Sequence, residues 1–303
     1  MNQEISSFNS KMTNIFIGLF SKNPLLRPYS LKIHNLGYKI HSIEPSFKSK
    51  GKIINPEAIA YSDNRNHALL TEWTAANSLS DEKEKQIRRY LLVDSDDLRK
   101  IGSANVDFNA NGSCSLWVTV LPDSLQTFQN IFDNTNSGRL VLCSFYQLPT
   151  GEHCIEFHSG NISDTELSSI ISTNMKFKRI PEGYLPIPIE DLKDPRVSDS
   201  VIQQVITFLI RENCEFSVED ICESMIEIWN YLPTEKRKGI IKAVKRIMRN
   251  LASRQYCRDW LVYERPNWKA RNLSKTNLNK FISKVSADNI NFNQPNADSN
   301  LEN

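Results

Sequence analysis

The sequence predicts a mixed α/β domain followed by a smaller, mainly helical domain. Segments with strand character alternate with amphipathic helical segments through the first 178 residues. Four prolines then fall between residues 179 and 196, and neither helix interiors nor central strands tolerate them. Beyond this stretch the apolar residues recur at helical spacing. We therefore expect domains at 1–178 and 197–271, a proline-rich connector at 179–196, and a flexible, asparagine-rich tail at 272–303.

The composition is that of a soluble globular protein. Of 303 residues, 40% are hydrophobic and 24% are charged, which gives enough apolar material for a core in each domain. The longest apolar run near the N-terminus, Ile15 to Phe20, is too short to span a bilayer and lacks the features of a signal peptide. We expect a cytoplasmic protein with no membrane partner. The six cysteines lie far apart without a C-x-x-C pair, so we expect buried, reduced thiols.

The elements of the first domain can be assigned in order. A strand is expected at residues 39–44. Residues 56–62 and 67–73 both have strand character, and the polar turn at 63–66 between them predicts a β-hairpin. After the hairpin we expect a helix at 80–93, a strand at 115–122, a helix at 123–134, and strands at 139–146 and 153–160.

The hairpin brings two carboxylates together. Counting outward from the turn places Ser62 opposite His67 and Glu57 opposite Glu72. Directly opposed side chains lie about 5 Å apart, and like charges there destabilise a sheet. A divalent cation would remove that penalty, and oxygen ligands suit Mg²⁺ or Mn²⁺. Thr74 lies on the same face as Glu72, because side chains alternate along a strand.

An ordinary strand end is the alternative interpretation of this hairpin. Carboxylates at hairpin ends are common, and a one-residue bulge would place Glu57 and Glu72 on opposite faces. His67, opposite Ser62, is expected to have a structural role.

Here the sequence resembles the PD-(D/E)XK nuclease superfamily. That family has a Pro-Asp pair at the start of one strand and an acid, any residue and Lys at the end of the next. Pro56-Glu57 and Glu72-Trp73-Thr74 stand in the corresponding places. The resemblance implies that Glu57 and Glu72 bind Mg²⁺ or Mn²⁺ in a DNA endonuclease or exonuclease.

The resemblance continues into the next helix. Gln86 and Tyr90 stand one helical turn apart and are similar to the Q-x-x-x-Y signature of the RecB-like branch, whose site they would help to complete. The resemblance to the PD-(D/E)XK superfamily covers roughly residues 40–145 and implies a restriction endonuclease-like mixed sheet flanked by helices.

Two positions depart from the family pattern. Glu57 replaces Asp and keeps a carboxylate, whereas Thr74 replaces the Lys that stabilises the charge of the transition state. The missing cation favours an inactive protein unless another lysine supplies it. The candidates for such a migrated lysine are Lys50, Lys52, Lys83 and Lys85.

The second domain has three expected helices, at 199–213, 217–232 and 233–254, followed by two extended segments within 256–268. Ser217 and Asp220 have the spacing of a capping box at the start of the second helix. Five aromatic residues are expected in the core of this domain: Trp229, Tyr231, Trp260, Tyr263 and Trp268.

Positive charge is concentrated in this second domain. Residues 235–272 contain twelve Lys or Arg against three acids, a local net charge of +9 in a chain whose total is +2. Such an asymmetry favours a polyanionic partner.

The order of helices and extended segments resembles a winged helix-turn-helix domain. The resemblance implies DNA contacts from the third helix and the wing, mainly to the backbone, because no Asn or Gln lies on the cationic stripe to read bases. The alternative is a solvated charged face in a protein-interaction domain. The implied contact residues are Arg237, Lys238, Lys242, Lys245, Arg246 and Arg249 on the helix, and Arg258, Arg265 and Lys269 on the wing.

Three functions remain open. The leading hypothesis is a DNA-binding protein with a degenerate, metal-dependent nuclease-like domain in mobile-element or phage-defence machinery, a setting that rests on family analogy. The second is an inactive adaptor that docks a partner protein on DNA within a multi-subunit complex. The third is a transcriptional regulator whose first domain senses a ligand.

Overall fold

The chain forms two compact units in the computed structural model, residues 1–182 with 231–233 and residues 183–230 with 234–303, so that the main boundary in the sequence falls between Glu182 and Gly183. This boundary lies within the expected connector. The connector ends earlier than expected, because Pro195 begins a helix, a position at which proline is favoured. The structure describes residues 2–75, 81–99, 112–133, 138–181, 195–210, 215–226, 228–254, 257, 261–270 and 274–287.

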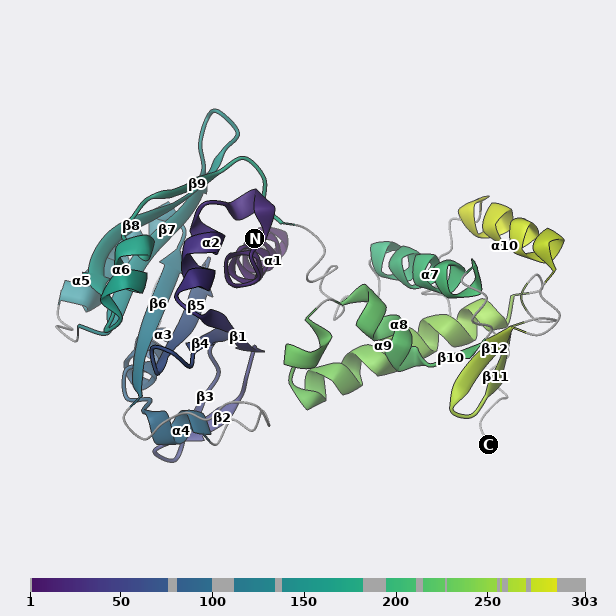
Figure 1. Ribbon diagram of the computed structural model, residues 1–303, viewed down its shortest axis with the longest axis horizontal. Helices are drawn as coiled ribbons and strands as arrows, with labels where there is room; N and C mark the ends of the chain where they lie inside the picture. The colour runs from purple at the N-terminus through teal and green to yellow at the C-terminus, as the bar shows by residue number, and fades with distance from the viewer. Residues whose placement is uncertain are drawn as a thin grey trace. The chain divides into compact units, whose positions relative to one another are not determined.

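The first unit is built on a seven-stranded mixed sheet with the order β1-β4-β5-β6-β7-β8-β9 (Figure 1). Strands β5, β6 and β7 are mutually parallel, and the other neighbours are antiparallel. Two short strands pair separately as β2 (Phe47–Ser49) and β3 (Lys52–Ile54). The strands of the main sheet are β1 (Tyr38–Ile43), β4 (Ala58–Ser62), β5 (His67–Thr74), β6 (Ser113–Val120), β7 (Leu140–Gln147), β8 (His153–Asn161) and β9 (Met175–Phe177).

Both faces of the sheet carry helices. One face is covered by α1, whose Phe16 ring lies 6.0 Å from the ring of Trp73 on β5. The opposite face packs against Ile87 of α3 and Phe128 of α5, and Leu70 of β5 belongs to that core. The helices and 3₁₀ turns of this unit are α1 (Asn2–Phe20), η1 (Pro24–Leu26), α2 (Tyr29–Asn35), α3 (Asp81–Tyr90), α4 (Ser95–Arg99), η2 (Pro122–Ser124), α5 (Leu125–Asp133) and α6 (Thr165–Ile171).

The predicted hairpin is confirmed in its register. Strands β4 and β5 pair Ser62 with His67 and continue to Ala58 with Thr71. The alternation along β5 then puts Leu70, Glu72 and Thr74 on the face that α3 and α5 cover. Glu72 is therefore a carboxylate on a largely apolar face.

One position of the sheet requires glycine because the backbones of β7 and β8 approach each other closely there. Gly160 on β8 has φ +90°, and a Cβ added there would lie 2.0 Å from the carbonyl oxygen of Leu140 on β7. Only glycine fits this position without displacement of the strands.

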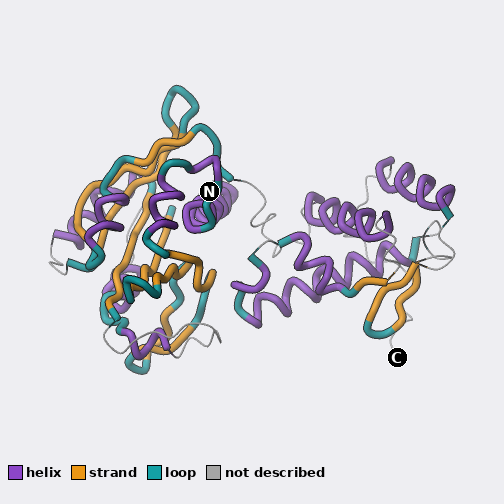
Figure 2. The backbone as a smooth tube through the Cα atoms, viewed as in Figure 1, coloured by secondary structure: helices purple, strands orange, loops and turns teal. Residues whose placement is uncertain are grey.

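The second unit combines helices with a three-stranded antiparallel sheet of order β10-β12-β11, drawn in orange in Figure 2. Ser217 caps α8 in the predicted capping box with Asp220, through bonds of 2.6 and 3.0 Å. The second predicted helix is shorter than expected, because the backbone at Ile226 is extended and ends it. The elements are α7 (Pro195–Ile210), β10 (Glu215–Phe216), α8 (Val218–Met225), η3 (Trp229–Tyr231), α9 (Thr234–Ala252), β11 (Leu261–Glu264), β12 (Asn267–Ala270) and α10 (Lys275–Ala287).

The predicted flexible tail is wrong for residues 275–287, which form the helix α10. Phe281 is fully buried and anchors one side of this helix. Polar residues dominate this segment, so a helical spacing of apolar residues is hard to recognise there. The aromatic prediction is also corrected: Trp229 and Trp268 are buried, but Tyr231 and Tyr263 are exposed, and Trp260 lies outside the described residues.

The described cysteines agree with the expectation of reduced thiols, since all are free and buried: Cys114, Cys143, Cys154, Cys222 and Cys257. Among the helices that the structure describes, none combines the length and the hydropathy needed to cross a membrane.

Candidate functional site

The centre of the candidate site is the carboxylate of Glu72 on β5. Only 1% of the side chain is exposed, and the residue stands between Leu70 and Thr74 on the face covered by α3. Its Oε1 forms an ion pair with Nζ of Lys83 from the first turn of α3. Its Oε2 is buried and accepts no hydrogen bond from the residues that the structure describes, although the Tyr90 hydroxyl is close enough to lower the pKa of the carboxyl. Burying a carboxylate that has a single ion-pair partner among the described residues is costly in free energy, which makes this position unusual for a purely structural residue.

A second part of the site comes from the last turn of α3. The amide of Gln86 donates to the hydroxyl of Tyr90, and that hydroxyl donates to the backbone oxygen of Asn55, 2.5 Å away. Asn55 lies two residues before Glu57, so the tyrosine connects α3 to the strand that follows Glu57. The structure thus places Tyr90, with Gln86 bonded to it, near the carboxylate of Glu72.

Glu57 lies directly before β4 and is half-buried. The predicted direct pairing with Glu72 is not part of the β4–β5 ladder, which stops at Ala58 and Thr71. The amide of Glu57 donates instead to the oxygen of Thr71, 3.0 Å away, so the strands are offset by one residue at this end and Glu57 is not the cross-strand partner of Glu72 that the sequence predicted. The preceding Pro56 has no N–H to continue the ladder, which explains why the pairing ends there.

Electrostatics link these groups. Burial raises the pKa of Glu72, while Lys83 and then Tyr90 act in the opposite direction. Burial also raises the pKa of Tyr90, and the carboxylates of Glu72 and Glu57 add to this effect. The tyrosine therefore stays protonated, and both acids are close enough to influence the same hydroxyl.

The side chain of Thr74 is buried on the same face, two residues beyond Glu72. It provides a hydroxyl where the nuclease pattern has a cation. Among the described residues, no three His, Cys, Asp or Glu side chains gather as a ready set of metal ligands. Two carboxylates still suit Mg²⁺, which is often bound by one or two carboxylates together with waters and substrate phosphates.

Of the four lysines considered as replacements for the missing cation, Lys83 is the one paired with Glu72. Lys50, Lys52 and Lys85 are exposed. One signal in the sequence could have distinguished Lys83 from the other three lysines. Lys83, Gln86 and Tyr90 are spaced i, i+3 and i+7, which puts all three on one helix face.

A separate buried network surrounds His67 at the other end of β5. Its Nδ1 lies 2.5 Å from the hydroxyl of Tyr38, and its Nε2 lies 3.0 Å from Oγ of Ser115. The Tyr38 hydroxyl also donates to Asp164 at 3.0 Å. Burial lowers the pKa of His67 to about 4, with Asp164 opposing the shift and Arg139 adding to it. All four network residues are buried, in keeping with the structural role predicted for His67.

The cationic residues of the second unit lie largely on one side of α9. Lys238, Lys242, Lys245 and Arg249 are exposed at helical spacing, opposite the buried Ile240, Val244 and Ile247, and Arg246 is exposed beside them. Arg237 is half-buried. Lys238 also pairs with Glu235 at 2.7 Å, within the same helix.

The other predicted contact residues differ in their surroundings. Arg265 is exposed in the turn between β11 and β12. Lys269 on β12 lies 3.3 Å from both Glu215 and Glu264, so its charge is compensated within the sheet. Arg258 lies outside the described residues.

The first unit is thus a mixed α/β domain with a buried carboxylate–lysine pair on one face of its sheet. A family model described as the MJECL32 domain matches residues 9–185, which is more than half of the chain and nearly all of this unit. The chain belongs to the MJECL32 domain family. No curated protein and no solved structure matches it.

Proposed function

We propose that the protein binds DNA and that its first unit is an altered metal-dependent phosphodiesterase of the PD-(D/E)XK type. The observation that carries this proposal is the ion pair between Lys83 and the buried Glu72. It supplies from α3 the cation that Thr74 lacks. The position of Gln86 and Tyr90 on the same helix supports the same assignment.

The chemistry of such a site is hydrolysis of a phosphodiester. A water attacks phosphorus, one P–O ester bond breaks, and the products are a phosphomonoester and an alcohol. Glu57 and Glu72 would hold Mg²⁺ or Mn²⁺, which polarises the phosphate and lowers the pKa of water. Lys83 places positive charge beside the developing negative charge. Tyr90 and Gln86 offer neutral polar groups that position the substrate strand.

The second unit supports DNA binding through its charge and its topology. Its elements follow the order α7, β10, α8, α9, β11 and β12, with β12 between β10 and β11. This order is the one expected for a winged helix, with α9 as the recognition helix and the β11–β12 hairpin as the wing. The exposed lysines and arginines of α9 suit phosphate contacts, which supply affinity without sequence discrimination.

Cleavage is tested with linear and supercoiled DNA in Mg²⁺ or Mn²⁺. Replacing Glu72 by Gln keeps the shape of the side chain and removes its charge, so we expect cleavage to fall at least about a hundredfold. Glu82→Gln is the matched control, because this exposed glutamate lies on α3 next to Lys83. Identical products from wild type and Glu72→Gln would exclude the catalytic assignment.

DNA binding is tested by reversing Lys242 and Lys245 to Glu. We expect the double variant to lose binding and the remaining affinity to depend weakly on salt. The control reverses Lys176 and Lys178 on and beside β9, which are exposed and belong to the first unit. Wild-type affinity in the Lys242/Lys245 variant would overturn the DNA-binding proposal.

One observation favours a second candidate function, an inactive adaptor that holds a partner protein on DNA. Lys83 occupies Oε1 of Glu72, one of the oxygens that a metal ion would use. A wild-type protein that binds DNA, fails to cleave it and takes up no Mn²⁺ in a titration followed by electron paramagnetic resonance would favour the adaptor. Mn²⁺ binding that disappears in Glu72→Gln would favour the phosphodiesterase.

A further inference from the structure

The strands β2 and β3 form a two-stranded ribbon whose inner face is anchored in the first unit. Phe47 on β2 and Ile54 on β3 are cross-strand partners, and both belong to the hydrophobic core that also contains Ile87 of α3. On the same strand as Phe47, the hydroxyl of Ser49 donates to the carboxylate of Asp97 at 2.5 Å. The β2–β3 ribbon is therefore held by packing on one face and by a buried hydrogen bond at its turn.

The outer face of the β2–β3 ribbon is cationic. Lys48 and Ile53 are cross-strand partners on this face, and both are exposed, Ile53 to 60%. Lys50 in the turn and Lys52 at the start of β3 are exposed as well. No acid occurs in the sequence at residues 45–56, and none of the three lysines forms an ion pair with a residue that the structure describes. Charge of one sign thus surrounds an exposed apolar side chain.

The β2–β3 ribbon leads directly into the candidate site. Asn55 follows β3, Glu57 comes two residues later, and the hydroxyl of Tyr90 donates to the Asn55 oxygen. Lys52 precedes Glu57 by five positions, so their Cα atoms lie at most about 17 Å apart. One strand of duplex DNA carries a phosphate about every 3.4 Å along the helix axis. A phosphate on the ribbon and a phosphate at the site can therefore belong to the same strand, about five nucleotides apart or fewer.

We propose that the β2–β3 ribbon is a DNA-binding arm of the first unit, with Lys48, Lys50 and Lys52 on backbone phosphates and Ile53 in the groove between them. This inference rests on the proposed function. A two-stranded ribbon fits the major groove, where an apolar side chain meets thymine methyl groups and lysines reach the flanking phosphates. A lipid bilayer fits less well, because one exposed isoleucine offers far less apolar surface than a membrane-bound helix buries.

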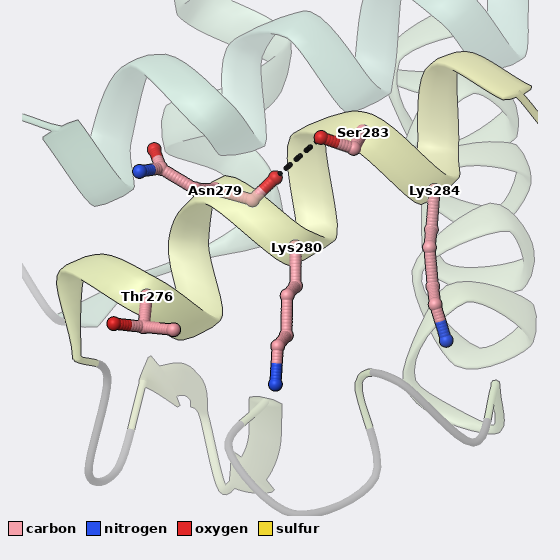
Figure 3. A pocket seen from close by; sticks show the side chains of 5 residues that line it. All are labelled: Thr276, Asn279, Lys280, Ser283 and Lys284. Atoms are coloured by element: carbon pink, nitrogen blue, oxygen red, sulfur yellow. Dashed lines mark hydrogen bonds between the residues drawn. The ribbon is translucent and has the colours of Figure 1, made fainter.

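Cations also stand on α10 in the second unit. The side chains of Lys280 and Lys284 extend to the same side of this helix (Figure 3). Lys284 already has an interaction of its own, whereas the three lysines of the β2–β3 ribbon have none with the described residues. We therefore place the additional DNA contact on the ribbon.

The charge of the arm is tested in the full chain by replacing Lys48, Lys50 and Lys52 together by Gln. We expect the affinity for a duplex at about 0.1 M salt to fall at least about tenfold and the log–log salt slope to decrease by about 2.7, because each phosphate contact contributes about 0.9. The matched control replaces by Gln three other exposed lysines of the same unit: Lys32, Lys176 and Lys178. Wild-type affinity and slope in the ribbon variant, or an equal change in the control, would overturn the proposal.

The apolar contact is tested separately by Ile53→Ser. We expect the affinity to fall on the order of fivefold while the salt slope stays that of the wild type, because the change removes apolar contact and no charge. Leu25→Ser, at an exposed leucine of the same unit, is the control and should bind as the wild type does. Wild-type affinity in Ile53→Ser would overturn the placement of Ile53 in the groove. Thermal unfolding of each variant verifies that the chain is folded.

The Lys242→Glu/Lys245→Glu variant belongs in the same series, so that two failures can be told apart. If this variant binds as the wild type does, the proposed role of α9 is wrong. If it loses affinity while the ribbon variant keeps wild-type affinity and slope, only the arm is overturned. Vesicles of phosphatidylserine and phosphatidylcholine provide the last measurement: loss of vesicle binding in the ribbon variant, with DNA affinity unchanged, would assign the ribbon to a lipid surface and overturn the proposal.

Discussion

Charged groups occupy opposite surroundings in the two units. Glu72 is almost fully buried and depends on one lysine, whereas the cations of α9 are exposed and spaced along a helix face. Removing one partner of a buried pair leaves an unpaired charge in a medium that solvates it poorly. Removing one exposed lysine leaves its neighbours in place. The buried Glu72–Lys83 pair therefore depends on both of its members. The exposed cations of α9 can replace one another, and their interactions are weakened by salt.

The largest effect is expected from Lys83→Met. It leaves Glu72 buried without its cation, and we expect the free energy of unfolding of the first unit to fall by about 3 kcal/mol at pH 8. Burial already raises the pKa of Glu72, so the carboxyl is more readily neutral in the folded state. The loss should therefore be smaller at pH 5, where protonation removes the unpaired charge.

Urea unfolding at both pH values measures this effect. Lys85→Met is the matched control, since Lys85 is exposed on the same helix. Equal stability of the two variants at pH 8 would show that the Glu72–Lys83 pair does not matter for folding.

The next effect concerns acid stability and should distinguish the units directly. All five histidines of the chain precede residue 160, so none belongs to the second unit. The pKa of His67 is lowered to about 4 by burial, and a group with a lowered pKa contributes stability that is lost as the pH falls. We expect the first unit to lose up to about 3 kcal/mol between pH 6.5 and pH 4 through His67.

Hydrogen exchange followed by mass spectrometry reports each unit separately. His67→Gln should flatten the pH dependence of the first unit and leave that of the second unchanged. An equally steep loss in the variant would mean that other groups cause the acid sensitivity.

A smaller effect on stability is expected from replacing one glycine by alanine in each unit. Gly239 lies within α9, and no atom of the described residues lies within 4 Å of an added Cβ, so Gly239→Ala should stabilise the second unit by up to about 1 kcal/mol. Gly160→Ala should destabilise the first unit, because its Cβ would meet the Leu140 oxygen. Thermal unfolding of the two variants measures both, and a shift of the same sign in each would contradict the prediction.

The smallest effect is expected from a single exposed lysine. Lys245→Gln removes one phosphate contact out of several, so the DNA affinity should fall only about threefold and the log–log salt slope by about 0.9. Fluorescence titration at several salt concentrations measures both. A loss as large as that of the Lys242→Glu/Lys245→Glu variant would mean that Lys245 makes a specific contact rather than one of many equivalent ones.

Several features of the fold could be predicted from the sequence, because they are local. The hairpin register followed from a polar turn, the α8 cap followed from Ser217 and Asp220, and the α9 face followed from helical spacing. The boundary between the units followed from proline. These signals depend on residues a few positions apart.

Other features depend on contacts between distant segments. The helix α1 is specified by apolar residues that reach β5 across more than fifty positions, and α10 depends on one buried phenylalanine. The offset at Glu57 arises where Pro56 ends a ladder, and counting from the turn does not reveal it. Which of the four lysines pairs with Glu72 depends on where α3 packs on the sheet, and this packing brings Lys83 to the carboxylate.

The hydrogen bond between Tyr90 and Asn55 bears on how Lys83 can separate from the carboxylate of Glu72. It ties α3, the helix that carries Lys83, to the segment directly before Glu57. Lys83 can leave Glu72 by rotating its own side chain, which is 22% exposed and has solvent into which to turn. Lysine side-chain rotation is fast, on the order of nanoseconds for exposed groups. Release of the carboxylate thus needs the rotation of one side chain, and its cost is the unpaired charge that it leaves on the buried Glu72.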